Sequence, residues 1–265
     1  MNYFLTILII CVWNTLCLAQ GISVSPSRIF FKGDPGQTVS QVITLSNSSK
    51  IPFHFVTTIK DWDRDSLGNK RYFPAGQQGQ SNASWLSLNE NTVHLAPGET
   101  RQVNLSMSIP NDSKAQKLTN SMLFFTQVKE QQTVLHPGVN MNVLLEVGIQ
   151  VYHTPAGLQA GELEFLAFED KGIQSRANSK TRRMRVKIKN TGQINKDAYL
   201  RFELTNTETG GEVPVKAIAI ALLPAAEQWV EVDLPAELKG PYLAVALLDA
   251  GSQYDLKIAE KEITY

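Results

Sequence analysis

Cysteine is nearly absent from this chain of 265 residues, and its two cysteines, Cys11 and Cys17, both lie near the amino terminus. Residues 4–13 form an apolar run too short to span a bilayer, and Cys17-Leu18-Ala19 then supplies the small-residue end that suits a signal peptidase. We therefore predict that residues 1–19 are a secretory signal peptide. An uncleaved anchor is the alternative, because no Lys or Arg precedes the apolar run. The mature chain would contain no thiol, so its hydrophobic cores must stabilise it.

The chain also lacks an excess of either charge. Its 25 Lys and Arg residues balance its 25 Asp and Glu residues, so no overall field attracts nucleic acid or an anionic membrane. No second apolar run reaches the ~18 residues that a spanning helix needs. We expect no nucleic-acid partner and no stable membrane insertion of the mature chain.

Catalytic motifs are missing as well. The 4 histidines are scattered, and the chain has no G-x-S-x-G, H-E-x-x-H, P-loop or paired-cysteine motif. We expect neither an enzyme nor a cofactor. Residues 61–69 space three carboxylates as a calcium loop would, but Ser66 stands where an EF-hand has glycine, and Tyr72 where it has a bidentate glutamate. A polar hairpin loop is therefore expected rather than a metal site, with Trp62 packed on the protein.

Short strand-like segments separated by turn residues run along the whole chain. Residues 22–31, 38–46 and 53–61 are examples, and no amphipathic helix of normal length interrupts them. The same pattern of strand-like segments and turn residues resumes after Pro155. Each half of the chain holds about seven such segments, the number in an immunoglobulin-like sandwich. We predict an all-β protein of two immunoglobulin-like β-sandwich domains. Residues 20–155 would form the first and residues 156–265 the second.

Residues 140–152 alternate apolar with other residues, as a strand with one apolar face does. The apolar set is Met141, Val143, Leu145, Val147, Ile149 and Val151. A long apolar strand at a sheet edge can recruit another chain through its unpaired backbone groups. The other interpretation is an ordinary core strand of a sandwich.

Basic residues alternate with Met184, Val186 and Ile188 in a further predicted strand. The basic set is Arg182, Arg183, Arg185, Lys187 and Lys189. The alternation predicts a strand with a basic outer face. This face is either simply solvated or a binding surface for an acidic ligand or an anionic surface.

Several short segments of the first half form an ordered set. In residues 25–31 an arginine precedes an apolar run, and Leu95-Ala96-Pro97-Gly98-Glu99 has a proline-glycine turn. The other segments of the set, in chain order, are residues 45–47, 50–53, 120–125 and 152–155. Together these segments resemble the amino-terminal domain of the periplasmic pilus-assembly chaperones, the PapD-like family, with residues 25–31 similar to its first strand. The chain is identified as a divergent member of this family.

The resemblance implies a boomerang of two sandwiches with a subunit-binding cleft between them. Chaperones of this family lend their alternating strand to a pilus subunit that lacks its last strand, without ATP or metal. The corresponding donor residues here would be Met141, Val143, Leu145, Val147 and Ile149. In the family, a cleft arginine and a lysine anchor the subunit's terminal carboxylate. Arg28 matches the arginine, whereas Gln150 stands in the place of the lysine.

The predicted function is therefore that of a periplasmic chaperone for fimbrial or related surface-fibre subunits, acting by β-strand donation. A homodimer in which two open edges cap each other is a further expectation. The alternative is a secreted structural or adhesive binding protein of two immunoglobulin-like domains. In that protein the alternating strand would be internal to its own sheet, Arg28 a strand-end arginine, and Gln150 would need no explanation.

Overall fold

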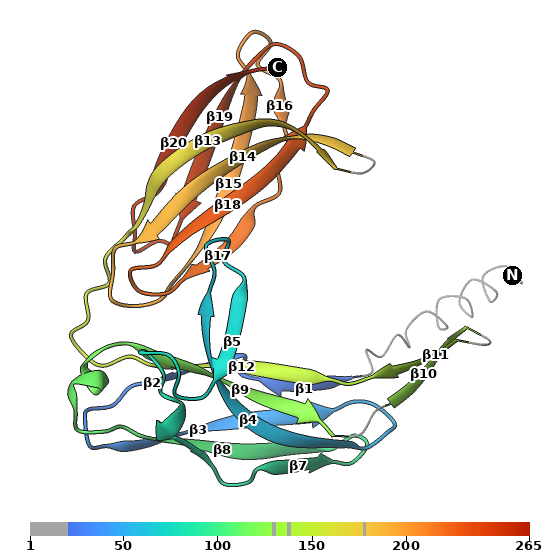
Figure 1. The fold of residues 1–265 in the computed structure, drawn as a ribbon, viewed down its shortest axis with the longest axis vertical. Helices are drawn as coiled ribbons and strands as arrows, with labels where there is room; N and C mark the ends of the chain where they lie inside the picture. Colours follow the sequence, from blue (N-terminus) through green and yellow to red (C-terminus); the bar gives the residue numbers. More distant parts are fainter. Residues whose placement is uncertain (1–20, 129–130, 137–138, 177–178) are drawn as a thin grey trace, which may run out of the picture.

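The computed structural model describes residues 21–128, 131–136, 139–176 and 179–265, which form two β-sandwiches set at an angle to each other (Figure 1). The predicted signal peptide, residues 1–19, lies outside the described residues. In the described part of the chain, no helix is long and apolar enough to cross a membrane. The predicted all-β class and the boomerang of two sandwiches are confirmed.

The first sandwich packs a four-stranded sheet against a six-stranded one. The four-stranded sheet has the order β1 (Ile22–Ser25), β3 (Thr38–Asn47), β8 (Thr100–Ser108) and β6 (Leu86–Leu88). The six-stranded sheet has the order β2 (Arg28–Phe31), β12 (Glu146–His153), β9 (Thr119–Gln127), β4 (Phe53–Arg64) and β5 (Lys70–Pro74), with β7 (Thr92–Leu95) also on β4. Two short 3₁₀ helices, Ala83–Trp85 and Ser113–Gln116, complete it.

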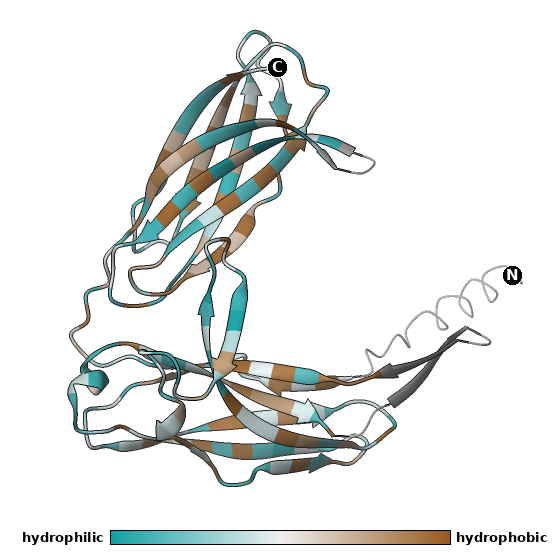
Figure 2. Ribbon diagram, in the orientation of Figure 1, coloured by the Kyte–Doolittle hydropathy of each residue, from teal (hydrophilic) through white to brown (hydrophobic). Residues whose placement is uncertain are grey.

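Alternation along the strands builds the core of the first sandwich. Ile43 and Leu45 of β3 lie in one buried cluster with Leu105 of β8 and Phe55 of β4. Thr44, which lies between Ile43 and Leu45 in β3, is on the other face of the strand. Figure 2 shows the resulting alternation of apolar and polar residues along the strands of both sandwiches. Burial of such large apolar side chains supplies most of the driving force for folding.

The second sandwich repeats this construction with different strand counts. One sheet has the order β13 (Leu163–Arg176), β14 (Ser179–Asn190) and β18 (Glu227–Pro235). The other has the order β16 (Glu212–Val213), β15 (Lys196–Asn206), β19 (Pro241–Asp249) and β20 (Lys257–Thr264), with β17 (Ile218–Leu222) also on β15. Residues 154–162, which include Pro155, connect the two sandwiches.

Two predicted strands are each divided in the structure. Residues 22–31 form β1 and β2, which lie in different sheets on either side of Pro26. Proline has no backbone N–H and cannot continue a ladder, so the chain changes sheets there. Residues 140–152 form β11 (Val139–Val143) and β12, and β11 pairs with β10 (Gln131–His136) as a separate hairpin. The single long strand expected from the alternation was therefore wrong.

The division of the alternating segment has a clear cause in its neighbour. Strand β9 ends at Gln127, and among the described residues its pairing with the alternating segment begins only at Glu146. The side chain of Gln127 accepts a hydrogen bond from Leu145 N at 3.1 Å, and the backbone N–H of Gln127 donates to Leu145 O at 2.9 Å. Local hydrophobic periodicity says nothing about where a partner strand ends.

Candidate functional site

Strand β12 is paired on both edges along only half of its length. On one side it pairs antiparallel with β9 from Glu146 to His153. On the other side it pairs parallel with β2 only from Gln150 to His153. Among the described residues, no strand therefore pairs with the second edge of Glu146, Val147, Gly148 and Ile149. The expected edge strand is real over this half, whereas residues 150–153 are internal to the sheet.

The predicted donor residues pass from exposed to buried along the chain. Val143 is 42% exposed, Leu145 is half-buried against the first core, and Val147 is half-buried. Ile149 is fully buried among the core residues of the first sandwich, so its side chain is not accessible in this structure and its donor role stays a prediction. The side chain of Met141 lies outside the described part of the chain. The accessible part of the predicted face is therefore Val143, Leu145 and Val147.

The two residues predicted to anchor a carboxylate lie side by side. Arg28 opens β2 and is the cross-strand partner of Gln150 in β12. The Arg28 guanidinium makes an ion pair with Asp197 of β15, in the second sandwich. Gln150 is buried, and its Oε1 accepts a hydrogen bond of 2.7 Å from the Tyr152 hydroxyl. The sequence thus identified two true neighbours, although it gave no indication that Asp197 meets one of them.

Aromatic rings support this corner of the first sandwich. The ring of Tyr152 stacks on Phe30 at a centroid distance of 5.1 Å and meets Trp62 edge-on at 6.0 Å. Burial is the main reason that the pKa of Tyr152 lies above its ordinary value, so its hydroxyl stays protonated and can donate to Gln150. Trp62 is fully buried and donates to Ser121 O at 2.9 Å, which confirms the expected packing role.

The β4–β5 hairpin contributes residues that the sequence did not single out as part of this site. It rises from the first sandwich and reaches the second (Figure 1), where Trp229 N donates to Ser66 O at 2.7 Å. Gly68, with a φ of +83°, has no room for a side chain because Gln228 fills the adjacent space. Arg64 ends β4 and Lys70 begins β5, so the hairpin places two cations near Arg28.

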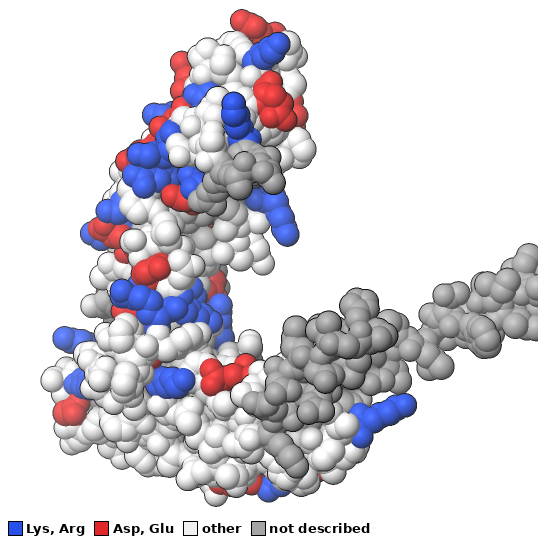
Figure 3. All heavy atoms as spheres, turned by 45° about the vertical axis from the view of Figure 1, so that its right-hand side comes forward, with Lys and Arg blue, Asp and Glu red and all other residues white. Residues whose placement is uncertain are grey.

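A cleft of about 950 Å³ lies where the hairpin, the first sandwich and the second sandwich meet. Arg28, Arg64, Asp197, Tyr199 and Trp229 are among the residues that line it. Figure 3 shows Lys and Arg side chains gathered at this junction. The arrangement places positively charged donors in a space open to solvent, which suits the binding of an anionic group.

The three carboxylates of residues 61–69 have separate partners and do not form a calcium loop. Asp61 is buried and accepts hydrogen bonds from Gln78 N and from the Ser81 hydroxyl. Asp63 pairs with Arg71, and Asp65 accepts the backbone N–H groups of the hairpin turn. No group of three metal-ligating side chains occurs in the described residues. The expected polar hairpin loop is confirmed.

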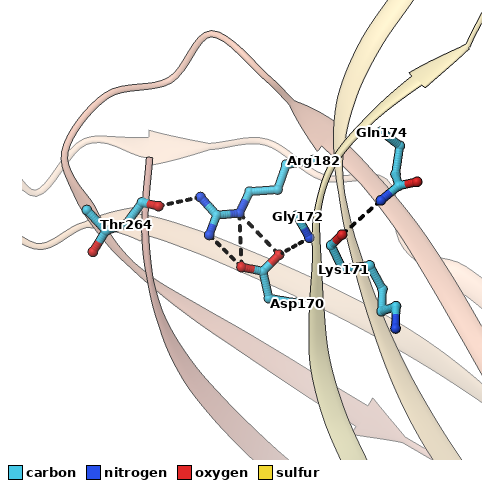
Figure 4. Close-up of polar contacts among 6 residues, drawn as sticks. All are labelled: Asp170, Lys171, Gly172, Gln174, Arg182 and Thr264. Atoms are coloured by element: carbon cyan, nitrogen blue, oxygen red, sulfur yellow. Dashed lines mark hydrogen bonds and ion pairs between the residues drawn. The ribbon is translucent and has the colours of Figure 1, made fainter.

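Four cations, Arg183, Arg185, Lys187 and Lys189, lie on the outer face of β14, whereas Arg182 lies on the buried face with Met184, which corrects the expectation for Arg182. Carboxylates of the neighbouring strands pair with all five. The ion pairs are Arg182–Asp170, Arg183–Asp233, Arg183–Glu231, Arg185–Glu169, Lys187–Glu227 and Lys189–Glu227. Figure 4 shows the most buried of these ion pairs, between the Arg182 guanidinium and the Asp170 carboxylate. The same guanidinium also donates a hydrogen bond to Thr264 O at 2.6 Å. The ion pairs tie β14 to β13 and β18, and the Arg182–Thr264 hydrogen bond ties it to β20. These contacts favour a structural role for the basic residues of β14.

No family model and no curated protein matches the sequence of the chain. Solved pilus chaperone structures are similar to it. One is a chain of the CsuC–CsuE chaperone–tip adhesion subunit complex from Acinetobacter baumannii, at 12% identity over 91% of this chain and 97% of that chain, with a TM-score of 0.47. Another is the CupB2 chaperone of Pseudomonas aeruginosa, at 12% identity, coverage of 90% and 99%, and a TM-score of 0.45. The E. coli chaperone DraB shows 16% identity, coverage of 92% and 98%, and a TM-score of 0.44.

Proposed function

We propose that the protein is a periplasmic chaperone for fimbrial or related surface-fibre subunits and that it acts by donating a β-strand. The observation that carries the proposal is the open edge of β12 at Glu146–Ile149. Unpaired backbone groups at such an edge can form ladder hydrogen bonds with an incoming chain. The proposed partner is a subunit that lacks one strand of its own sandwich.

The side chains beside this edge supply the second contribution to binding. Val143, Leu145 and Val147 are spaced two residues apart and remain partly or largely accessible. Alternate side chains of one strand lie about 6.7 Å apart on one face. Val143 ends β11, Leu145 lies between the strands and Val147 lies in β12, so pairing with a subunit would have to align the three before they could enter successive pockets of its groove. Complete burial of an exposed aliphatic side chain contributes about 1.5–3 kcal/mol. Burial of these three side chains in a subunit would therefore add to the free energy of binding.

Arg28 is the proposed anchor for the terminal carboxylate of the subunit, with Gln150 beside it. The guanidinium can hold a carboxylate with two charge-assisted hydrogen bonds. Gln150 can add only a neutral hydrogen bond, because its amide carries no charge. The activity is binding alone and requires neither nucleotide nor metal.

One observation favours the rival proposal of a structural or adhesive binding protein. Ile149 and Val151 of β12 are fully buried in the core, as residues of an ordinary sandwich strand would be. In that case the open edge is only the place where β2 turns away, and a partner would bind elsewhere. The two proposals differ in what accompanies the protein in its native envelope.

The test is to isolate the tagged protein from its native cell envelope under mild conditions and to identify co-purifying proteins by mass spectrometry. A small β-rich secreted subunit in near one-to-one amount supports the chaperone proposal. A clean monomer, or a polysaccharide or surface-layer partner, supports the structural binding protein. A homodimer linked through the open edges would appear as a change in molecular mass that disappears when a subunit is added.

A further inference from the structure

Two cations of the first sandwich, Arg28 and Arg64, line one corner of the cleft, and a third, Lys70, is the cross-strand partner of Arg64. Arg28 comes from β2, Arg64 from the end of β4 and Lys70 from the start of β5. Arg64 and Lys70 both lie over the buried ring of Trp62, at 5.6 and 5.8 Å from its centroid. The common platform holds two of the three charges close together, although like charges repel each other.

The carboxylates that line the cleft neutralise only part of this charge. Asp197 pairs with Arg28. Glu231 pairs instead with Arg183 of the second sandwich at 3.1 Å, and Asp249 accepts the backbone N–H of Gly251 at 2.9 Å. In the described part of the chain, no ion pair involves Arg64 or Lys70. The corner therefore has an excess of positive charge.

Burial is the largest cause that lowers the pKa of both unpaired cations. For Arg64, Tyr152 and Asp197 raise the pKa, and the positive charge of Arg28 lowers it. Burial also lowers the pKa of Lys70, followed by the charges of Arg64 and Arg28. An anion placed among these groups would relieve the repulsion between them.

Arg64 has the hydrogen-bonding capacity that Gln150 lacks. Within the described residues, Arg64 donates a single hydrogen bond, from Nη1 to Gly68 O at 2.6 Å. A guanidinium carries five N–H donors, so Arg64 can still present a fork to a carboxylate. Gln150 can donate to a carboxylate only through its neutral Nε2 amide, because its Oε1 is an acceptor, here of the Tyr152 hydroxyl.

The proposed function already assigns a carboxylate to Arg28. We propose that Arg64 is the second anchor of this carboxylate, and that Asp197 is an internal carboxylate that the ligand must displace from Arg28. In the free chain Asp197 occupies the position that the ligand would take. The proposal rests on the proposed function for the source of the ligand, the terminal carboxylate of a client. Displacement also removes an ion pair between the two sandwiches, so binding in the cleft loosens a contact that joins them.

The probe for this site is an N-acetylated Gly-Ser-Phe tripeptide with a free terminal carboxylate, compared with the same tripeptide as its terminal amide. Binding to the processed secreted protein is followed by NMR through the Nε–Hε signals of ¹⁵N-labelled arginines. The acid is expected to shift the signals of Arg28 and Arg64, and the amide is not. The preference for acid over amide is expected to fall about ten-fold or more in Arg64→Gln, because a charged hydrogen-bond partner is lost.

Asp197→Asn tests the displacement step. Removing the competing carboxylate is expected to raise the affinity for the acid several-fold. Asp249→Asn is the matched control, because it removes the same charge from the same cleft without touching Arg28. Its effect on the affinity is expected to be smaller than two-fold.

Three results would overturn the proposal. They are an acid preference unchanged in Arg64→Gln, no gain of affinity in Asp197→Asn, or an equal gain in Asp249→Asn. If Arg64→Gln does not fold, Arg64→Lys keeps the charge and must show a weaker preference than the parent, because it loses the fork. The proposed chaperone function can fail separately, since it depends on co-purification of a subunit and not on the tripeptides.

Discussion

Gln150 of β12 lies directly across from Arg28 of β2, at the first residue pair of the parallel ladder between these strands. This pairing fixes where the open edge of β12 ends and where the cleft begins. Its consequence is that the edge and the cationic corner are adjacent parts of one surface. A client that adds a strand to the edge would bring its own chain end close to Arg28.

Substituting Gln150→Lys adds a fourth cation beside this corner. We expect the free energy of unfolding to fall by about 1–3 kcal/mol, because the new ammonium is buried near like charges and Tyr152 loses its acceptor. Urea denaturation measures this cost. Gln150→Met, which removes the amide without adding charge, serves as the control and should cost less. Equal losses of unfolding free energy in Gln150→Lys and Gln150→Met would show that the positive charge around Arg28 and Arg64 is already balanced.

Removing Arg182 should destabilise the second sandwich. Arg182→Met leaves the Asp170 carboxylate without its main partner and deprives Thr264 O of a donor. The expected loss is roughly 2–4 kcal/mol, because both members of the pair are largely buried. Lys189→Met is the comparison, since its ion pair of 3.7 Å is exposed and should contribute under about 1 kcal/mol. Chemical denaturation with a probe in the second sandwich reports both, and equal losses would contradict this reading of the pair.

The same pair predicts a pH dependence. The hydrogen bonds from Arg182 are the first cause that holds the pKa of Asp170 below its ordinary value near 3.8. A carboxylate with a lowered pKa in the folded state stabilises the protein above its unfolded pKa, and this contribution disappears as the pH falls through the folded pKa. The stability difference between the parent and Arg182→Met should therefore be full at neutral pH and shrink below about pH 4. Denaturation series from pH 7 to pH 2 test this, and a constant difference would contradict it.

Gly148 marks a close approach between β12 and β9. An ideal Cβ at residue 148 would stand 2.9 Å from Cε1 of Phe124 and 3.3 Å from Sδ of Met122. Gly148→Ala should therefore displace the Phe124 ring and lower the stability by about 1–2 kcal/mol. Gly79→Ala is the control, because nothing lies within 4 Å of an added Cβ there. Thermal unfolding of both variants measures these changes in stability. An unchanged stability of Gly148→Ala would contradict the prediction and would mean that the Phe124 ring moves aside without cost.

Much of the fold could be predicted from local sequence, because strand rhythm and turn residues are local properties. The two sandwiches and the burial of Trp62 followed from such patterns. The division of residues 140–152 did not, because it depends on where β9 ends. The burial of Ile149 likewise depends on which half of β12 covers the core.

The candidate site was partly accessible from the sequence. Arg28 and Gln150 were found because each lies in a segment that resembles a known strand. Asp197 was not found, since it is 169 residues from Arg28 and no local pattern links them. Arg64 lay in a segment correctly interpreted as a hairpin, but the reach of that hairpin to the second sandwich is a tertiary property.

Strand donation is tested most directly by comparing two exposed valines. Val143 is 42% exposed beside the open edge, whereas Val42 of β3 is 47% exposed on the opposite sheet. Both Val→Asp variants should stay folded, because neither site is buried. The measurement is the amount of subunit that co-purifies from the native envelope with each tagged variant. We predict that Val143→Asp loses the subunit and that Val42→Asp keeps it. A subunit retained by Val143→Asp, or lost equally from both variants, would contradict strand donation.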